Sequence, residues 1–182
     1  MARVAFSKLN VSIAEFALHH SDIEESLRLY FSPNAPTFGA RFFGDLIEEV
    51  NEKLEQRLAE IDMASALTVL SALEAAFRID YLQRCYRKEK DPLSRAFRDL
   101  HKRKQTRVRL ETEIFDAWKE NTDVEAKLIG DLRSAFKFRH WLAHGRYWEP
   151  KFGREYDFVT VYGLAASVLS SFPLLGPSAE MP

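Results

Sequence analysis

DMASALTVLSALEAAFRIDYLQRCYRKEK, residues 62–90, contains neither proline nor glycine and is rich in residues that favour helices. Its apolar side chains recur at intervals of three and four residues, which places them on one face of an α-helix. This face is formed by Ala64, Leu67, Leu70, Ala72, Leu73, Ala76 and Phe77. The run therefore predicts a long buried helix.

The same spacing continues on both sides of this run, and the period-two alternation typical of strands is almost absent. We therefore expect an all-α fold, an antiparallel helical bundle with a long extra helix pair. Besides 62–90, helices are predicted over 12–31, 45–60, 93–119, 122–145 and 157–171.

Local signals set these boundaries. Two prolines in Ser32–Pro36 end the first helix, and Asp91-Pro92 separates the long run from the next one. The polar segment 101–109 is expected to protrude or bend. Thr122–Glu125 fits a capping box, and Gly145 fits a helix stop.

The chain has 182 residues, 46% of them apolar, which suits one domain that needs no disulfide or structural metal. We expect a core over about 42–172, a helical N-terminal extension over 1–40 and a loose tail over 173–182. Cys85 stands alone and no leader is seen, so a cytoplasmic location is expected. The uncharged run 158–179 is interrupted by Gly163 and Pro173, so a membrane span is rejected.

Charge is segregated, although the formal net charge is only -1. Residues 84–109 hold 11 basic side chains against three acidic ones, whereas 45–62 hold seven acidic against two basic. Such a basic face attracts phosphate backbones by counterion release, and the alternative is an ordinary solvated helix surface. The candidates for contact with an RNA backbone are Lys102, Arg103, Lys104, Arg107 and Arg109.

An arginine interrupts the apolar stripe of the helix predicted over 122–145. On a helical wheel, Arg139 points along the centre of a face otherwise formed by Leu128, Leu132, Ala135, Phe136, Leu142 and Ala143. A guanidinium cannot discard its charge, so this position indicates a polar cleft. The alternative is an arginine that reaches solvent or pairs with a carboxylate such as Glu74 or Asp80.

His140 and His144 lie four residues apart on the same flank of this helix. Imidazoles exchange protons near neutral pH, so the pair is a candidate for proton transfer. A metal site is the weaker interpretation, because Trp141 stands where a zincin has glutamate and no third ligand has recognisable spacing.

The segment Arg139-His140-Trp141-Leu142-Ala143-His144-Gly145 resembles the signature of the HEPN superfamily, in which an arginine, a polar residue and a short spacer precede a histidine. The resemblance is sharp over 136–148 and diffuse elsewhere, where it rests on helix order and on residues 73–81. It implies a helical, metal-independent endoribonuclease without a cofactor, whose cleft forms between two subunits of a homodimer.

In that interpretation His144 moves a proton, Arg139 holds the scissile phosphate and His140 helps to orient it. The products would be a 2′,3′-cyclic phosphate and a 5′-hydroxyl, and DNA would be inert. Residues five apart differ by about 140° on an ideal helix, so a loosened helix end, a curled arginine or the partner subunit must bring Arg139 and His144 together.

Four further residues are assigned supporting roles: Glu74, Arg78, Asp80 and Tyr147. A toxin branch of the family has its tyrosine two residues after the histidine, whereas here it follows three after. Five aromatic residues near the signature could stack on bases, with packing as the favoured alternative: Phe136, Phe138, Trp141, Tyr147 and Trp148.

The biological setting implied by the family is defence, toxin activity or RNA processing, with a cognate antitoxin or inhibitor protein as a further partner. A different class of function is also open. The same cleft could serve a non-catalytic module that binds RNA, a nucleotide or a protein partner.

Overall fold

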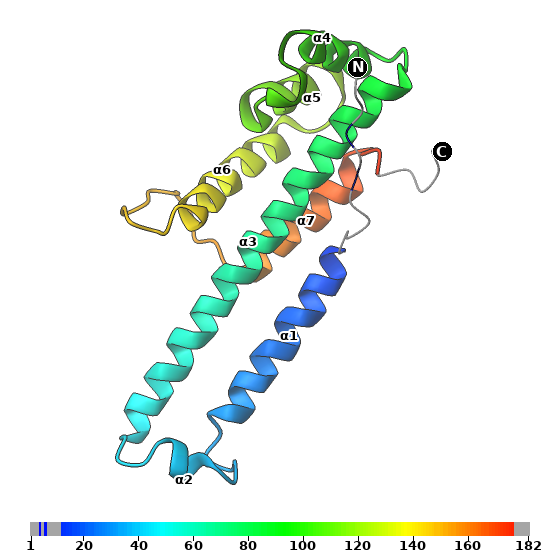
Figure 1. Ribbon diagram of the computed structural model, residues 1–182. Coiled ribbons are helices and arrows are strands. Elements are labelled where there is room, and N and C mark those ends of the chain that lie inside the picture. Colours follow the sequence, from blue (N-terminus) through cyan, green and yellow to red (C-terminus); the bar gives the residue numbers. More distant parts are fainter. Residues whose placement is uncertain (1–3, 5, 7–11, 177–182) are drawn as a thin grey trace.

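The computed structural model describes residue 4, residue 6 and residues 12–176. Over these residues the protein is helical and contains no strand, so the all-α prediction is confirmed (Figure 1). None of the helices described here has both the length and the apolar character that crossing a membrane requires.

A single helix, α3 (Ile47–Arg87), forms the spine of the molecule (Figure 1). It has 41 residues, which corresponds to a length of about 60 Å. The prediction of two helices, over 45–60 and 62–90, is wrong because nothing between them breaks the hydrogen-bonded ladder: residues 45–91 contain no proline or glycine. The helix ends at Lys88, whose φ of 57° is left-handed.

The N-terminal half of α3 pairs with α1 (Ile13–Tyr30) to form a two-helix arm, closed at its tip by the short α2 (Phe38–Arg41) (Figure 1). The Ser12 side chain accepts a hydrogen bond from Glu15 N at 3.2 Å, which caps α1 where the sequence predicts. Within residues 12–65 only Val50 is buried. The arm therefore contributes little to the core.

The core lies at the other end, between the C-terminal half of α3 and the helices that follow it. Its buried apolar cluster extends from Ala66 to Phe172. The largest fully buried side chains are Trp118, Tyr81, Phe77, Phe97 and Phe115.

The single helix predicted over 93–119 is wrong, although its predicted bend is confirmed. The chain forms α4 (Pro92–Lys104), a 3₁₀ turn η1 (Gln105–Arg107), a π-turn η2 (Leu110–Ile114) and α5 (Phe115–Asn121). Asp91 caps α4 by accepting from Ser94 N at 2.9 Å. The break falls at Gln105, whose φ of 53° lies outside helical geometry.

Two helices complete the bundle, α6 (Ala126–Ala143) and α7 (Phe158–Ser171). The predicted capping box at Thr122 is wrong. Thr122 Oγ1 donates instead to the carbonyl of Trp118 at 2.7 Å, at the end of α5, so α6 starts later than expected. Asp157 caps α7 by accepting a hydrogen bond from Thr160 N.

A buried ion pair joins the spine to the C-terminal segment. Arg84 Nε donates to Asp80 Oδ1 at 2.9 Å, and the same oxygen accepts from Leu175 N at 2.9 Å. Arg84 also donates to the carbonyl of Pro173. Of the tail predicted over 173–182, Pro173 and Leu175 are thus hydrogen-bonded to α3, while 177–182 lie outside the described residues. Burial raises the pKa of Asp80 above its ordinary value, against the opposing effects of Leu175 N and Arg84.

Replacing Arg84 by methionine leaves this buried carboxylate without its cation. We expect Arg84→Met to lower the free energy of unfolding by about 3–5 kcal/mol at neutral pH, measured by urea denaturation followed by circular dichroism. Arg84 lowers the pKa of Asp80, so its loss raises the pKa of folded Asp80 further above the ordinary value. The deficit should therefore shrink as the pH falls and Asp80 of the folded variant takes up its proton before that of the wild type.

The control is Lys102→Met, which breaks the exposed pair between Lys102 and Asp99. Its effect should stay within about 1 kcal/mol. Equal effects of the two substitutions would show that Arg84 does not anchor the bundle.

Candidate functional site

The C-terminal end of α6 is closed by a Schellman motif, as the glycine stop at Gly145 predicts. Gly145 N donates to the carbonyl of Leu142 at 3.3 Å, and Arg146 N donates to that of Trp141 at 3.1 Å. Gly145 and Arg146 are both left-handed, with φ of 79° and 57°. Two such residues in succession reverse the chain, so residues 147 and 148 return towards the end of the helix.

Arg139 faces α3 and meets a carboxylate there. Its Nη2 lies 3.2 Å from Glu74 Oε2, while Glu74 Oε1 accepts from Arg78 Nε at 2.8 Å. Glu74 is thus shared by two guanidinium groups. The Arg139 side chain is 32% exposed, and its Nε is buried without a hydrogen-bond partner in the described structure. The arginine is therefore paired within its own chain but is still open to solvent in part.

His140 and His144 are exposed, and their ring centroids are 4.1 Å apart. The shared flank predicted from their spacing is confirmed. His144 is the C-cap residue, so it lies where α6 has stopped being regular. No hydrogen bond, ion pair or ring contact within the described part of the chain joins Arg139 to His144.

The aromatic residues around the signature divide into two groups. Phe136 and Phe138 are buried, which confirms packing as their role. Trp141 is half-buried and its Nε1 donates to the carbonyl of Trp148 at 2.8 Å. Tyr147, by contrast, is 83% exposed.

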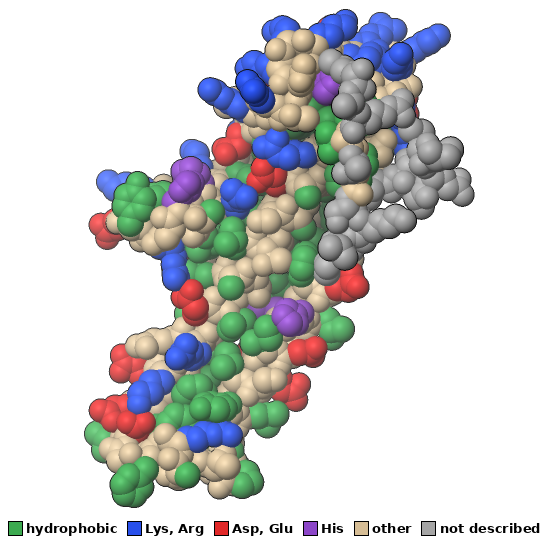
Figure 2. All heavy atoms as spheres, in the orientation of Figure 1, with side chains coloured by type: hydrophobic (Ala, Val, Ile, Leu, Met, Phe, Trp, Pro, Cys, Tyr) green, Lys and Arg blue, Asp and Glu red, His purple; other side chains and the backbone are tan. Residues whose placement is uncertain are grey.

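Of the predicted supporting residues, the structure brings Glu74 and Arg78 to Arg139. Asp80 is not part of this group, because it is buried in the ion pair with Arg84. The five basic candidates are all exposed and lie near the end of α4, where Figure 2 shows lysine and arginine side chains gathered. This region is away from the end of α6 (Figure 1). Two of them are paired, Lys102 with Asp99 and Lys104 with Glu113.

One residue that ties the end of α6 to α3 was not predicted from the sequence. Arg146 makes two hydrogen bonds to Glu60 on α3, at 2.8 and 2.9 Å, which tie the turn after α6 to the arm side of the spine. The two residues are 86 positions apart. No local pattern connects them, so only the fold could reveal the pair.

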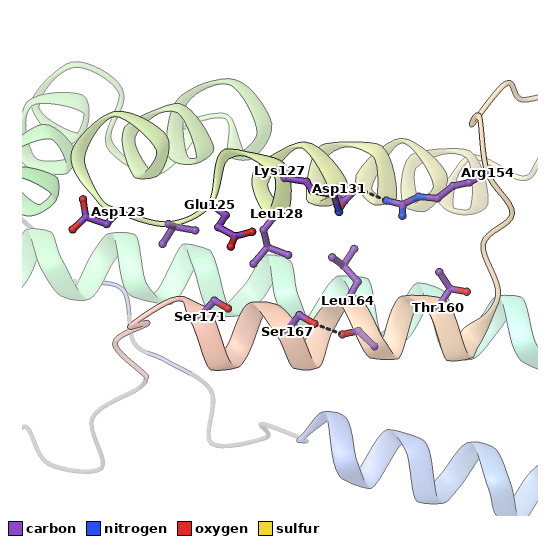
Figure 3. A pocket seen from close by; sticks show the side chains of 12 residues that line it. Asp123, Glu125, Lys127, Leu128, Asp131, Arg154, Thr160, Leu164, Ser167 and Ser171 are labelled. Atoms are coloured by element: carbon purple, nitrogen blue, oxygen red, sulfur yellow. Dashed lines mark hydrogen bonds and ion pairs between the residues drawn. The ribbon is translucent and has the colours of Figure 1, made fainter.

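A separate groove lies between α6 and α7, with a volume of about 510 Å³ (Figure 3). Asp131 is paired there with Arg154 and Lys127. None of the predicted site residues lines this groove. Within the described residues no group of three or more histidine, cysteine or acidic side chains is arranged to hold a metal ion.

No model of a known protein family matches the chain, and no curated protein or solved structure is significantly similar to it. The resemblance to the HEPN signature therefore stays a prediction that rests on residues 136–148.

Two glycines, Gly130 inside α6 and Gly145 just after it, provide a test of the assigned helix end. A side chain at Gly145 must adopt left-handed geometry, so we expect Gly145→Ala to destabilise the protein by about 1–2 kcal/mol. Gly130 lies inside α6 with open space around it, so Gly130→Ala should instead stabilise the protein by up to about 1 kcal/mol. Thermal unfolding measures both, and shifts of the same sign would contradict the assigned helix end.

Proposed function

We propose that this chain is a metal-independent endoribonuclease of HEPN type that acts as a homodimer. The observation that carries the proposal is the pair of exposed imidazoles at the end of α6, on the same turns of helix as a partly exposed arginine. Proton-transfer groups and a phosphate-binding cation are the parts that RNA transesterification needs.

In the proposed reaction the ribose 2′-oxygen attacks phosphorus and the bond from phosphorus to the 5′-oxygen breaks. A base removes the 2′-hydroxyl proton, and an acid protonates the leaving 5′-oxygen. We assign proton transfer to His144, with His140 beside it to orient the phosphate. The products are a 2′,3′-cyclic phosphate and a 5′-hydroxyl.

Arg139 is assigned to the phosphate. Glu74 engages one guanidinium nitrogen, and arginine has further N–H donors that can stabilise the charge developing on the phosphate oxygens. Because Arg139 faces α3 while His144 lies at the helix end, we propose that the second subunit completes each site. A cognate antitoxin or inhibitor protein remains part of this proposal, as does a role in defence, toxin activity or RNA processing.

A second candidate function is favoured by the ion pair between Arg139 and Glu74, which gives Arg139 a structural role. The chain would then be a non-catalytic module that binds RNA, a nucleotide or a protein partner through the same surface. It would form complexes with RNA and yield no cleavage products.

Cleavage assays distinguish the two candidates. We expect the wild-type protein to cleave RNA in the presence of a chelator, and Arg139→Ala and His144→Ala to lower the rate at least about 100-fold. Arg139→Lys keeps the charge opposite Glu74 but loses the planar donor geometry, so it should fold and still be impaired. DNA of the same sequence should stay intact.

Matched controls are His19→Ala on α1 and Arg57→Ala on α3, both exposed residues outside the site. Circular dichroism confirms that each variant is folded. Equal cleavage by wild type, Arg139→Ala and His144→Ala would overturn the assignment, and absence of cleavage with intact RNA binding would favour the non-catalytic module.

The basic segment near the end of α4 is proposed to bind the RNA backbone without sequence preference. Replacing Arg107 and Arg109, both exposed, by glutamine should weaken binding and lower the slope of log affinity against log salt by about 0.7–0.9 for each phosphate that is no longer neutralised. Titrations at several salt concentrations measure this slope. An unchanged slope would show that the segment is only a solvated surface.

A further inference from the structure

Tyr147 stands out among the aromatic residues near the end of α6 because its ring is presented to solvent. Its side chain is 83% exposed, whereas Phe136 and Phe138 are buried and Trp141 is half-buried. Neither packing in the core nor a hydrogen bond within the described structure accounts for this placement.

The backbone that carries Tyr147 is held on both sides. Before it, Arg146 is left-handed, its backbone N donates to the carbonyl of Trp141 at 3.1 Å, and its side chain makes two hydrogen bonds to Glu60. After it, the carbonyl of Trp148 accepts from Trp141 Nε1. A side chain on a fixed backbone loses little freedom when a ligand packs against it, which favours binding.

The rings of this segment continue directly into the histidine pair. The centroid of Tyr147 is 4.7 Å from that of Trp148, with the planes at 74°, and Trp148 is 6.0 Å from His140. His140 in turn is 4.1 Å from His144. The ring of Trp148 thus lies between that of Tyr147 and that of His140, which is assigned to orient the phosphate.

We propose that Tyr147, supported by Trp148, is a stacking platform for an unpaired nucleobase, and that the ligand is therefore single-stranded RNA. The inference rests on the proposed function for the class of ligand and adds the form of the RNA. A base inside a duplex is already stacked on its neighbours and cannot offer its face to a protein ring, whereas an unpaired base can. The platform holds a base next to the phosphate that His140 orients and at which His144 transfers a proton.

Binding rather than cleavage tests the platform. The probe is a fluorescently labelled single-stranded RNA with 2′-O-methyl groups, which cannot undergo attack by the 2′-oxygen. We expect Tyr147→Ala to weaken its binding roughly 5- to 150-fold, the range for removal of one stacked base. Tyr147→Phe keeps the ring and should bind within about twofold of wild type.

Phe43→Ala is the matched control, because Phe43 is an aromatic residue that is 92% exposed in the arm, and it should leave binding unchanged. A duplex of the same sequence should bind equally to wild type and Tyr147→Ala. The platform is overturned by wild-type affinity of Tyr147→Ala for the single strand, by an equal weakening for the duplex, or by failure of the wild type to bind RNA.

The two proposals fail in distinguishable ways. If unmodified RNA stays intact while Tyr147→Ala still lowers single-strand binding, the nuclease is excluded and the platform stands. If RNA is cleaved by wild type but Tyr147→Ala binds the probe normally, the nuclease stands and the platform is excluded.

Discussion

The unbroken course of α3 is the constraint on which the rest of the molecule depends. A helix of 41 residues is far longer than a small core can bury, so one half becomes the spine of the bundle and the other projects as an arm. All the other long helices, α1, α4, α6 and α7, pack against it. The position of each of these helices therefore depends on where it meets α3. In the candidate site, Arg139 contacts α3 through Glu74 and Arg146 contacts it through Glu60.

Glu74 shows how this spine positions chemistry. Its carboxylate is contacted by Arg78 on its own helix and by Arg139 from α6, so it sets the direction in which α6 presents its arginine. The buried Nε of Arg139 has no partner within the described residues, a cost that a polar ligand or water would relieve. Glu74 thus gives Arg139 a structural contact while leaving a third of its side chain open to solvent.

The segregated charge of the chain follows the long axis of the molecule. Residues 45–62, which hold seven acidic side chains against two basic ones, lie largely on the arm, whereas many lysine and arginine side chains gather around α4 (Figure 2). The arm also exposes large apolar side chains, among them Leu29, Phe43 and Leu46. The two ends of α3 thus offer surfaces of opposite character, with the end of α6 between them (Figure 1).

Helix ends that depend on neighbours in the chain were predictable from the sequence. Ser12 caps its helix through a residue three positions on, Asp91 does the same before α4, and Gly145 supplies the left-handed stop of α6. These signals involve hydrogen bonds within one turn, which the local sequence contains in full. Thr122 shows the limit, because its hydroxyl donates back to the carbonyl of Trp118 and accepts from Val124 N, and does not form the predicted capping box with Glu125.

By itself the sequence determined the all-helical class, most of the helix ends and the shared flank of His140 and His144, because spacing of three and four residues acts within a single helix. Only the tertiary structure decided that half of α3 projects as an arm, that Glu74 meets Arg139 and that Tyr147 is left exposed. It also brought together Glu60 and Arg146, 86 positions apart. Such pairs depend on how helices pack, and packing is a property of the whole core that no local pattern records.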